Sequence, residues 1–308
     1  MRLSSSMMVA KQLSNLMETY NSYSTAASQV SSGLRVTKPS DDPIAASQAT
    51  LVAQAQATSE RYGTARDSAN TSLSVEDTTL DQITDTIQNI QTLLVKVGNT
   101  TYSDADRESM SVELQALKDQ LVSLGNTTDG SGNYVFGGYA SGTAPFSVAT
   151  DGTVTYNGSD TAISLSVSSS RSIIIGDVGS DLYGSNGSNI FDTIDSVLSA
   201  MSTTLDGTDS TAKEAYSTTI NNALSTMDSQ YNSVLNIQTK VGAKMTELTA
   251  LDSQSSTMDV VNSDRKSALI EADYAESYSN YASLKVALQA SYSVVSTLGS
   301  LSLFSMNS

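Results

Sequence analysis

Apolar side chains recur at alternating steps of three and four residues at both ends of the chain. Near the N-terminus they occupy Val9, Leu13, Leu16, Tyr20, Tyr23, Ala27, Val30 and Leu34. Near the C-terminus they occupy Tyr274, Tyr278, Tyr281, Leu284, Leu288, Tyr292, Val295 and Leu298. This spacing gathers side chains on one narrow face of an α-helix, as in the seam of a coiled coil. It predicts a helix at each end, and we call the two sets of side chains the N-terminal stripe and the C-terminal stripe.

Apolar stripes at chain ends favour contact with a partner, because termini are usually poorly ordered unless something holds them. We therefore expect both stripes to form an assembly interface between subunits. An intramolecular coiled coil of the two terminal helices is the alternative. A ligand-stacking role for the C-terminal tyrosines is less favoured, because these residues keep the spacing of a packing seam.

Two long helices are predicted in the interior of the chain. The first begins near Pro43, ends at Gly98 and carries the seam Leu73, Leu80, Ile83, Ile87, Ile90, Leu94 and Val97. The second carries the seam Leu224, Met227, Tyr231, Val234, Val241, Met245 and Leu248, with Gln238 as one polar interruption. Because the periodicity weakens over residues 254–264, we expect the link to the C-terminal helix there.

A hinge with a helix cap is predicted after the first helix, which is expected to end near Gly33. The segment breaks the helical periodicity and contains Pro39, Ser40, Asp41, Asp42 and Pro43. An aspartate directly before a proline is typical of an N-cap followed by proline at the first helical position. Metal binding or acid/base catalysis by Asp41 and Asp42 is the less favoured alternative.

The middle of the chain follows a different pattern. Ser103 and Asp106 predict a capping box for a short helix that ends near Leu124, and another short helix is expected over residues 191–201. Between them lie strand-like segments at residues 134–136, 146–148, 153–156, 163–167 and 172–175, with Asp-Gly and Asn-Gly turns. The predicted fold is mainly α with a small antiparallel β module. We expect a terminal helical assembly domain (1–40 with 265–308), a long-helix bundle (41–133 with 186–264) and an outer β module (134–185).

Composition excludes several function classes. The 308 residues include no His, Cys or Trp, and the formal net charge is −16. Imidazole bases, thiolate nucleophiles and ordinary zinc sites are therefore absent. The chain also contains no block of basic residues of the kind that binds nucleic acid. No motif combines a nucleophile, a base and an orienting group, so we expect neither an enzyme nor a cofactor or metal. The apolar runs are too short for membrane insertion, and the start of the chain does not resemble a cleaved signal peptide.

Three sequence blocks resemble the flagellin superfamily, and within it the hook-filament junction proteins. The first comprises Ser32-Gly33-Leu34-Arg35-Val36 and Pro39-Ser40-Asp41-Asp42-Pro43-Ile44-Ala45-Ala46-Ser47-Gln48-Ala49. The second comprises Leu117-Lys118-Asp119-Gln120-Leu121, Asn126-Thr127-Thr128-Asp129-Gly130, Tyr134-Val135-Phe136-Gly137-Gly138-Tyr139 and Pro145-Phe146. The third comprises Leu288-Gln289-Ala290-Ser291-Tyr292 and Leu301-Ser302-Leu303-Phe304. Together the blocks cover both ends of the chain and the entry into the β module.

The resemblance implies a structural adaptor that connects the flagellar hook to the flagellin filament. Its terminal helices would pack between subunits in a ring-like or helical layer, and its β module would face outward. The implied partners are further copies of this chain, the preceding hook-associated junction protein, flagellin and an export chaperone. The chaperone would hold the C-terminal helix, at Leu288, Tyr292, Val295, Leu298 and Leu301. The resemblance also implies type III export, without a cleaved signal peptide, to the extracellular flagellum.

Two other functions stay open at this point. The chain could be a flagellin that forms the filament itself, which growth of long filaments by the purified protein would reveal. From a different class, it could be a dimeric coiled-coil adhesin or sensory rod, for which binding to hook-type proteins would be absent. Both alternatives use the same terminal stripes, so the periodicity alone does not separate them.

Overall fold

A computed structural model describes residues 2–205 and 210–304, with side chains from residue 7 to residue 297 outside the gap. Contacts within the chain divide it into two compact units. Unit 1 comprises Met1–Ser59 and Ser256–Ser308, and unit 2 comprises Glu60–Ser255. Unit 1 thus joins the two ends of the chain, and the β module belongs to unit 2. The three domains expected from the sequence remain a prediction.

The fold is mainly α with a small β insert, which confirms the predicted class. The helices are α1 (Arg2–Ser32), α2 (Pro43–Val97), α3 (Asp104–Gly125), α4 (Gly179–Tyr183), α5 (Ile190–Met201), α6 (Ser210–Ile270) and α7 (Tyr274–Phe304), with one 3₁₀ turn, η1 (Gly138–Ala140). The strands are β1 (Phe146–Val148), β2 (Val154–Tyr156), β3 (Ser164–Ser168) and β4 (Arg171–Ile174). Among the helices of the described ranges, none combines the length and the hydropathy of a membrane span.

Two chain breaks lie together in unit 1. Helix α1 ends where Gly33 adopts a φ of 70°, a left-handed conformation that glycine tolerates without steric cost. The N–H of Arg35 then donates to the carbonyl oxygen of Ile270 at 2.8 Å, and the N–H of Ala272 donates to that of Gly33 at 3.0 Å. The connection between α1 and α2 is therefore paired through its backbone with the connection between α6 and α7.

The link expected over residues 254–264 lies elsewhere. Helix α6 continues without a break to Ile270, and α7 begins at Tyr274. Asp273 caps the start of α7, because its Oδ1 accepts the N–H groups of Ala275 at 2.8 Å and Glu276 at 3.2 Å. Residues 254–264 contain neither Gly nor Pro. Their weak periodicity therefore reflects a helix surface left exposed and not a helix end.

The core of unit 2 confirms the two interior seams. All seven predicted seam residues of α2 are almost fully buried, as are Met227, Val234, Val241 and Leu248 on α6. The polar interruption of the α6 seam has a partner on α2, since Gln238 Nε2 donates to Asp81 Oδ1 at 2.5 Å. Helix α3 begins with the predicted capping box of Ser103 and Asp106. Periodic apolar burial therefore explains why these helices pack as they do.

The β module contains two separate antiparallel hairpins. Strand β1 pairs with β2, and β3 pairs with β4 with an irregular register between Ser166 and Ser168. The strand expected over residues 134–136 is absent. Tyr134 forms only an isolated bridge with Thr128, and the carbonyl oxygen of Phe136 accepts the N–H of Gly179 at 3.0 Å. The following glycines favour a turn there, and buried Phe136 anchors that turn to α4.

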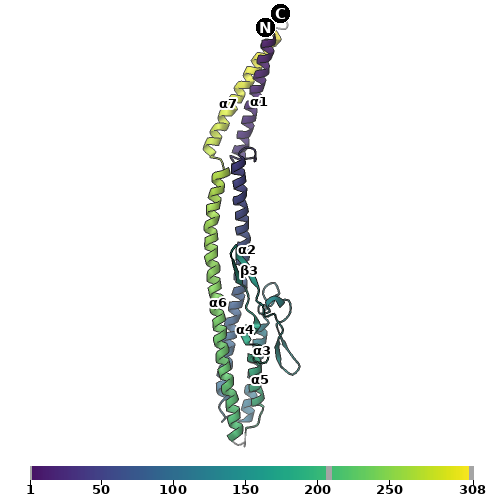
Figure 1. Cartoon of the computed structure of the whole chain (residues 1–308), viewed down its shortest axis with the longest axis vertical. Coiled ribbons are helices and arrows are strands. Elements are labelled where there is room, and N and C mark those ends of the chain that lie inside the picture. Colours follow the sequence, from purple (N-terminus) through teal and green to yellow (C-terminus); the bar gives the residue numbers. More distant parts are fainter. Residues whose placement is uncertain (1, 206–209, 305–308) are drawn as a thin grey trace. The chain divides into compact units, whose positions relative to one another are not determined.

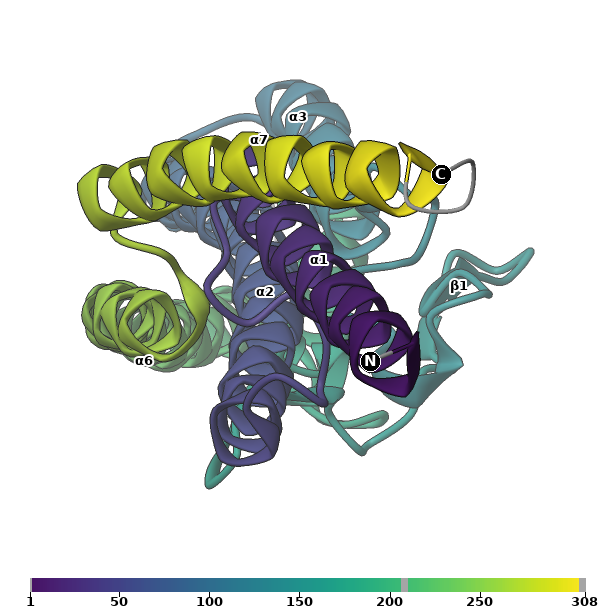
Figure 2. The same ribbon diagram turned by 90° about the horizontal axis from the view of Figure 1, so that it is seen from above.

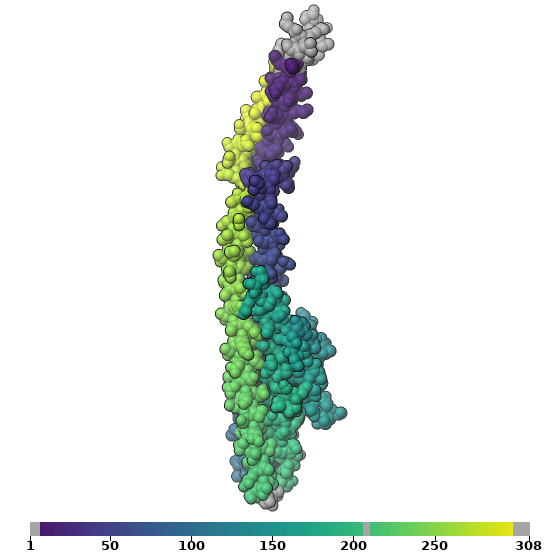
Figure 3. Space-filling view, viewed as in Figure 1, coloured from purple at the N-terminus to yellow at the C-terminus, as the bar shows by residue number. Residues whose placement is uncertain are grey.

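Charged side chains attach the β module to the long helices of unit 2. Arg171 on β4 pairs with Glu247 on α6, with Nη2 and Oε2 at 2.8 Å. Arg66 on α2 donates from Nη1 to the carbonyl oxygen of Val167 at 3.1 Å. In Figure 3 the module accordingly lies along one side of the α6 surface. Its position is thus fixed by contacts with both long helices.

A buried carboxylate supports the segment between β4 and α4. Glu76 on α2 has no exposed surface, and its Oε1 accepts the N–H of Asp177 at 2.8 Å. The carboxylate of Asp177 in turn lies 3.2 Å from Lys244 Nζ on α6. Burial, and after it the neighbouring Asp177 carboxylate, raise the pKa of Glu76 to about 7, although the N–H bond from Asp177 and the charge of Lys244 oppose the shift. Glu76 therefore titrates near neutral pH in the folded chain.

Candidate assembly surface

Helices α1 and α7 pack side by side in unit 1, with the two chain ends at the same end of the pair (Figure 1). The view from above shows the same contact (Figure 2). Tyr23 and Tyr281 stack across the pair with ring centroids 5.3 Å apart, and their hydroxyl groups lie 3.2 Å apart. This hydrogen bond raises the pKa of Tyr23. The two predicted stripes therefore meet within one chain.

The helix pair buries only part of each stripe. The stripe residues turned toward the pair are at least half buried, namely Leu16, Tyr23, Ala27, Val30, Leu34, Tyr281, Leu284, Leu288 and Val295. The others are exposed: Val9, Leu13, Tyr20, Tyr274, Tyr278 and Tyr292. Leu298 and Leu301 lie outside the described side chains. An intramolecular pair is thus present, and it leaves an apolar surface free for a further partner.

The exposed tyrosines of α7 continue the stack. Tyr274 and Tyr278 are 65% and 55% exposed, and their rings lie nearly parallel with centroids 6.3 Å apart. Tyr278 approaches Tyr281, which packs against Tyr23 on α1. We call Tyr274, Tyr278, Tyr281 and Tyr23 the tyrosine ladder. Rigid aromatic side chains of this kind dominate the energetics of protein interfaces.

Several exposed apolar residues of unit 1 were missed by the seam analysis. They are Met7, Met8 and Met17 on α1, Ile44 and Leu51 on α2, Met258, Val260 and Val261 on α6, and Val286 and Val294 on α7. The seven-residue step from Ile44 to Leu51 is a heptad signal that the sequence does contain. The apolar surface of unit 1 therefore extends beyond the two stripes.

The predicted hinge residues form a hydrogen-bonded corner between α1 and α2. Asp42 Oδ1 accepts the N–H of Ala45 at 3.0 Å, and its Oδ2 lies 3.2 Å from Arg35 Nη1. Asp41 Oδ2 accepts the N–H groups of Lys38 at 2.8 Å and Thr37 at 3.1 Å. The bond from Lys38 lowers the pKa of Asp41, and the bond from Ala45 lowers that of Asp42.

This corner joins three elements of unit 1. Arg35 also donates from Nη2 to the carbonyl oxygen of Leu269 on α6 at 2.7 Å. Pro39 and Ser40 are exposed at its outer edge, and Pro43 is the first residue of α2. Across the described side chains, no group of three potential metal ligands occurs. Both carboxylates serve the backbone turn and the start of α2.

Replacing Asp42 with alanine is expected to destabilise the start of α2 by about 1 kcal/mol, because a first-turn N–H loses its side-chain acceptor. Hydrogen exchange at residues 44–47 should accelerate several-fold, and that is the measurement. Ser40→Ala changes an exposed neighbour without removing the cap and serves as the control. Equal acceleration in both variants would contradict the capping role.

The full length of the chain matches a known structural protein of flagella. It is 36% identical over 320 residues to flagellar hook-associated protein 3 of Salmonella typhimurium, and the match covers 100% of both chains. Residues 3–141 match the family described as the bacterial flagellin N-terminal helical region. The chain belongs to the family of flagellar hook-associated protein 3. This family is structural.

Two further comparisons concern flagellin and the fold. The flagellin of Salmonella enteritidis is 31% identical over 121 residues, which cover 38% of this chain and 23% of that flagellin. The fold matches that of the flagellar junction protein FlgL from Legionella pneumophila, with a TM-score of 0.61 and 18% identity, covering 73% of this chain and 100% of that one. The match to flagellin thus covers part of the chain, whereas the match to hook-associated protein 3 covers all of it.

Proposed function

We propose that this chain is the junction adaptor between the flagellar hook and the filament, and that it assembles through the exposed apolar surface of unit 1. The observation that carries the proposal is the α1/α7 pair, which leaves Tyr20, Tyr274, Tyr278 and Tyr292 exposed although they lie on predicted packing seams. A row of exposed aromatic side chains is costly to leave in water, and contact between subunits would bury it.

The partners follow from the shared helical region. Because flagellin carries a related N-terminal helical region, subunits of both kinds would offer similar helix surfaces to one another. The adaptor would therefore contact its own copies in a ring-like or helical layer, flagellin on one side and the preceding hook-associated junction protein on the other. The β module belongs to unit 2, and we propose that it faces outward.

Before assembly, an export chaperone would cover the C-terminal stripe. An amphipathic helix commonly binds a partner by laying its apolar face in a groove. A chaperone that holds Leu288, Tyr292, Val295, Leu298 and Leu301 would compete with α1, since Leu288 is buried in the α1/α7 pair. In this proposal the chaperone separates α7 from α1, and the pair forms after export to the extracellular flagellum without cleavage of a signal peptide.

Electron microscopy of purified hooks that carry the preceding hook-associated junction protein, mixed with the purified chain, tests the proposal. We expect a short layer at the distal hook end that stops growing and then accepts flagellin, because an adaptor offers a different surface to each neighbour. Long filaments of this chain alone would identify a filament subunit instead. Hook ends left bare at micromolar protein would support a coiled-coil rod and refute the junction role.

A further inference from the structure

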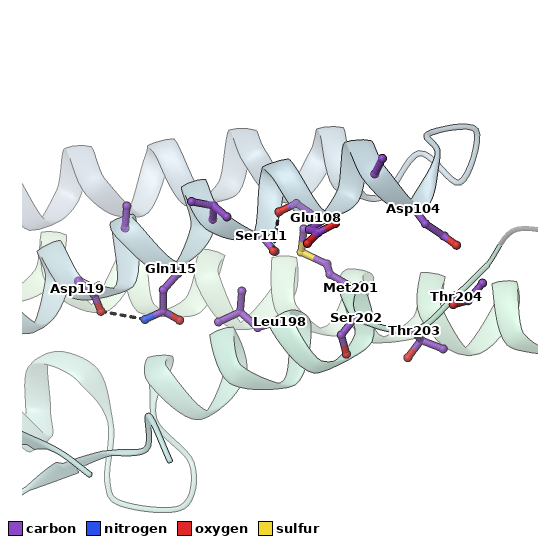
Figure 4. Close-up of a pocket in the computed structure, with 13 residues that line it drawn as sticks. Asp104, Glu108, Ser111, Gln115, Asp119, Leu198, Met201, Ser202, Thr203 and Thr204 are labelled. Carbon is purple, nitrogen blue, oxygen red and sulfur yellow. Dashed lines mark hydrogen bonds between the residues drawn. The ribbon is translucent and has the colours of Figure 1, made fainter. Parts of the chain in front are cut away.

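A second surface with binding character lies in unit 2, between α3 and the end of α5. It is a groove of about 880 Å³, within the range of about 300–1,000 Å³ that binding clefts occupy. One wall is the face of α3 from Asp104 to Asp119, and the other is formed by Leu198, Met201 and residues 202–204. Figure 4 shows Leu198 and Met201 lying opposite Ser111 and Gln115.

The floor of the groove is apolar and part of it is exposed. Val112 on α3 is 68% exposed, although the opposite face of α3 buries Leu114 and Leu121 completely. Leu198, which is partly buried, continues the apolar surface from α5, whereas Met201 behind it is only 4% exposed, and Ala105 and Ala116 leave room above the α3 backbone. The core of unit 2 does not use the exposed side of Val112.

The rim of the groove is acidic. Asp104, Glu108 and Asp119 line it, and the lining contains no basic residue. Asp104 is engaged by Arg107 and by the N–H of Leu205 at 3.1 Å. Glu108 and Asp119 take part in none of the ion pairs found among the described residues, and Asp119 accepts only an uncharged donor, Gln115 Nε2, at 2.9 Å. The carboxylates of Glu108 and Asp119 therefore lie beside the apolar floor without a cationic partner among the described residues.

We propose that this groove docks a basic amphipathic helix of another protein. From Asp104 to Asp119 a helix rises about 22 Å, which is the length of roughly four turns. The apolar face of the partner would cover Val112 and Leu198, and its flanking Lys or Arg side chains would reach Glu108 and Asp119. A groove with an apolar floor that receives an amphipathic helix, with complementary charges at its rim, is an established mode of recognition.

A second copy of this chain fits the groove poorly. The sequence holds 32 acidic and 16 basic residues, so copies repel one another at the acidic rim. The groove also shares no residue with the tyrosine ladder, because all its lining residues belong to unit 2. Its occupant is therefore independent of the surface proposed for assembly.

A designed peptide provides the test with the full chain. The probe is an amphipathic helix of about fifteen residues with leucines on one face and flanking lysines, and its matched control carries glutamates in place of the lysines. Fluorescence anisotropy should show that the lysine peptide binds with a dissociation constant below about 100 μM. Binding should weaken several-fold when salt rises, because salt screens the rim charges. The glutamate peptide should not bind.

Variants of the chain locate the binding site. Val112→Ser, or Glu108→Gln combined with Asp119→Asn, should weaken binding about tenfold, while the exposed controls Val95→Ser and Asp85→Asn on α2 leave it unchanged. The proposal fails if the glutamate peptide binds equally, if neither peptide binds, or if the groove variants bind as tightly as the controls. It also fails if the chain alone sediments as a dimer that Val112→Ser dissociates, since the groove would then hold a second copy.

Discussion

Replacing Tyr274 and Tyr278 together with serine is expected to abolish assembly of the chain onto hook ends. Both side chains are more than half exposed and stack on each other, so they contribute little to the fold of the free chain. Interface tyrosines of this type each contribute on the order of 2 kcal/mol. Losing two would weaken each subunit contact on the order of a thousandfold. Electron microscopy of hooks mixed with the variant measures the effect.

The control for this prediction is Tyr139→Ser. Tyr139 lies on η1 in unit 2 and is 64% exposed, which matches Tyr274 in residue type and exposure. This variant should assemble like the natural sequence. Thermal unfolding of both variants should shift by little, because exposed substitutions usually change stability by no more than about 0.5 kcal/mol. Normal assembly of the double variant would show that the tyrosine ladder is not part of the interface.

Replacing Glu76 with glutamine is expected to stabilise unit 2 at pH 8 and to have little effect near pH 4.5. The pKa of Glu76 rises from 4.5 to about 7 on folding, chiefly because the carboxylate is buried. The folded chain therefore holds a proton that the unfolded chain loses between these values, and stability falls as the pH rises through this window. The shift corresponds to a destabilisation of up to about 3 kcal/mol above pH 7. Glutamine still accepts the N–H of Asp177 and carries no charge.

Urea unfolding at pH 4.5, 6 and 8 tests this expectation. The free energy of unfolding of the natural sequence should decline over this pH range, and that of the glutamine variant should decline much less. Glu247→Gln is the contrasting control, because the bond with Arg171 lowers the pKa of Glu247. That pair stabilises the folded state above the ordinary glutamate pKa, so Glu247→Gln should lower stability slightly at pH 8. If the free energy of unfolding declined equally with pH in the natural sequence, Glu76→Gln and Glu247→Gln, Glu76 would not be the titrating group.

Helix termini were predictable where a side chain marks them locally. Asp42 before Pro43 and the Ser103–Asp106 box both cap the helices they were expected to cap. Asp273 is a similar local signal beside the end of α6. The link was instead predicted over residues 254–264, because the apolar seam weakens there. A seam reports which face of a helix is buried, whereas only caps and turns report where the helix stops.

The burial of charged residues in unit 2 could not be predicted from the sequence, for a different reason. Lys118 is almost fully buried because it reaches Asp195 on α5 and donates to the carbonyl oxygen of Gly152 at 2.7 Å. Lys118 and Gly152 are far apart in the sequence, and nothing next to either residue marks the contact. A buried cation is tolerable only with such partners. The burial of Glu76 arises in the same way, since its partner Asp177 is distant in the sequence.

By itself the sequence determined the helical class, the two interior seams, the corner at Asp42 and the two stripes, since each depends on residues within one or two helical turns. The tertiary structure decided which stripe residues α1 and α7 bury against each other, and hence that Tyr274 and Tyr278 stay exposed while Tyr281 does not. A helical period places a side chain on a face. The partner that covers this face, and how far it extends, depends on packing between segments distant in the sequence.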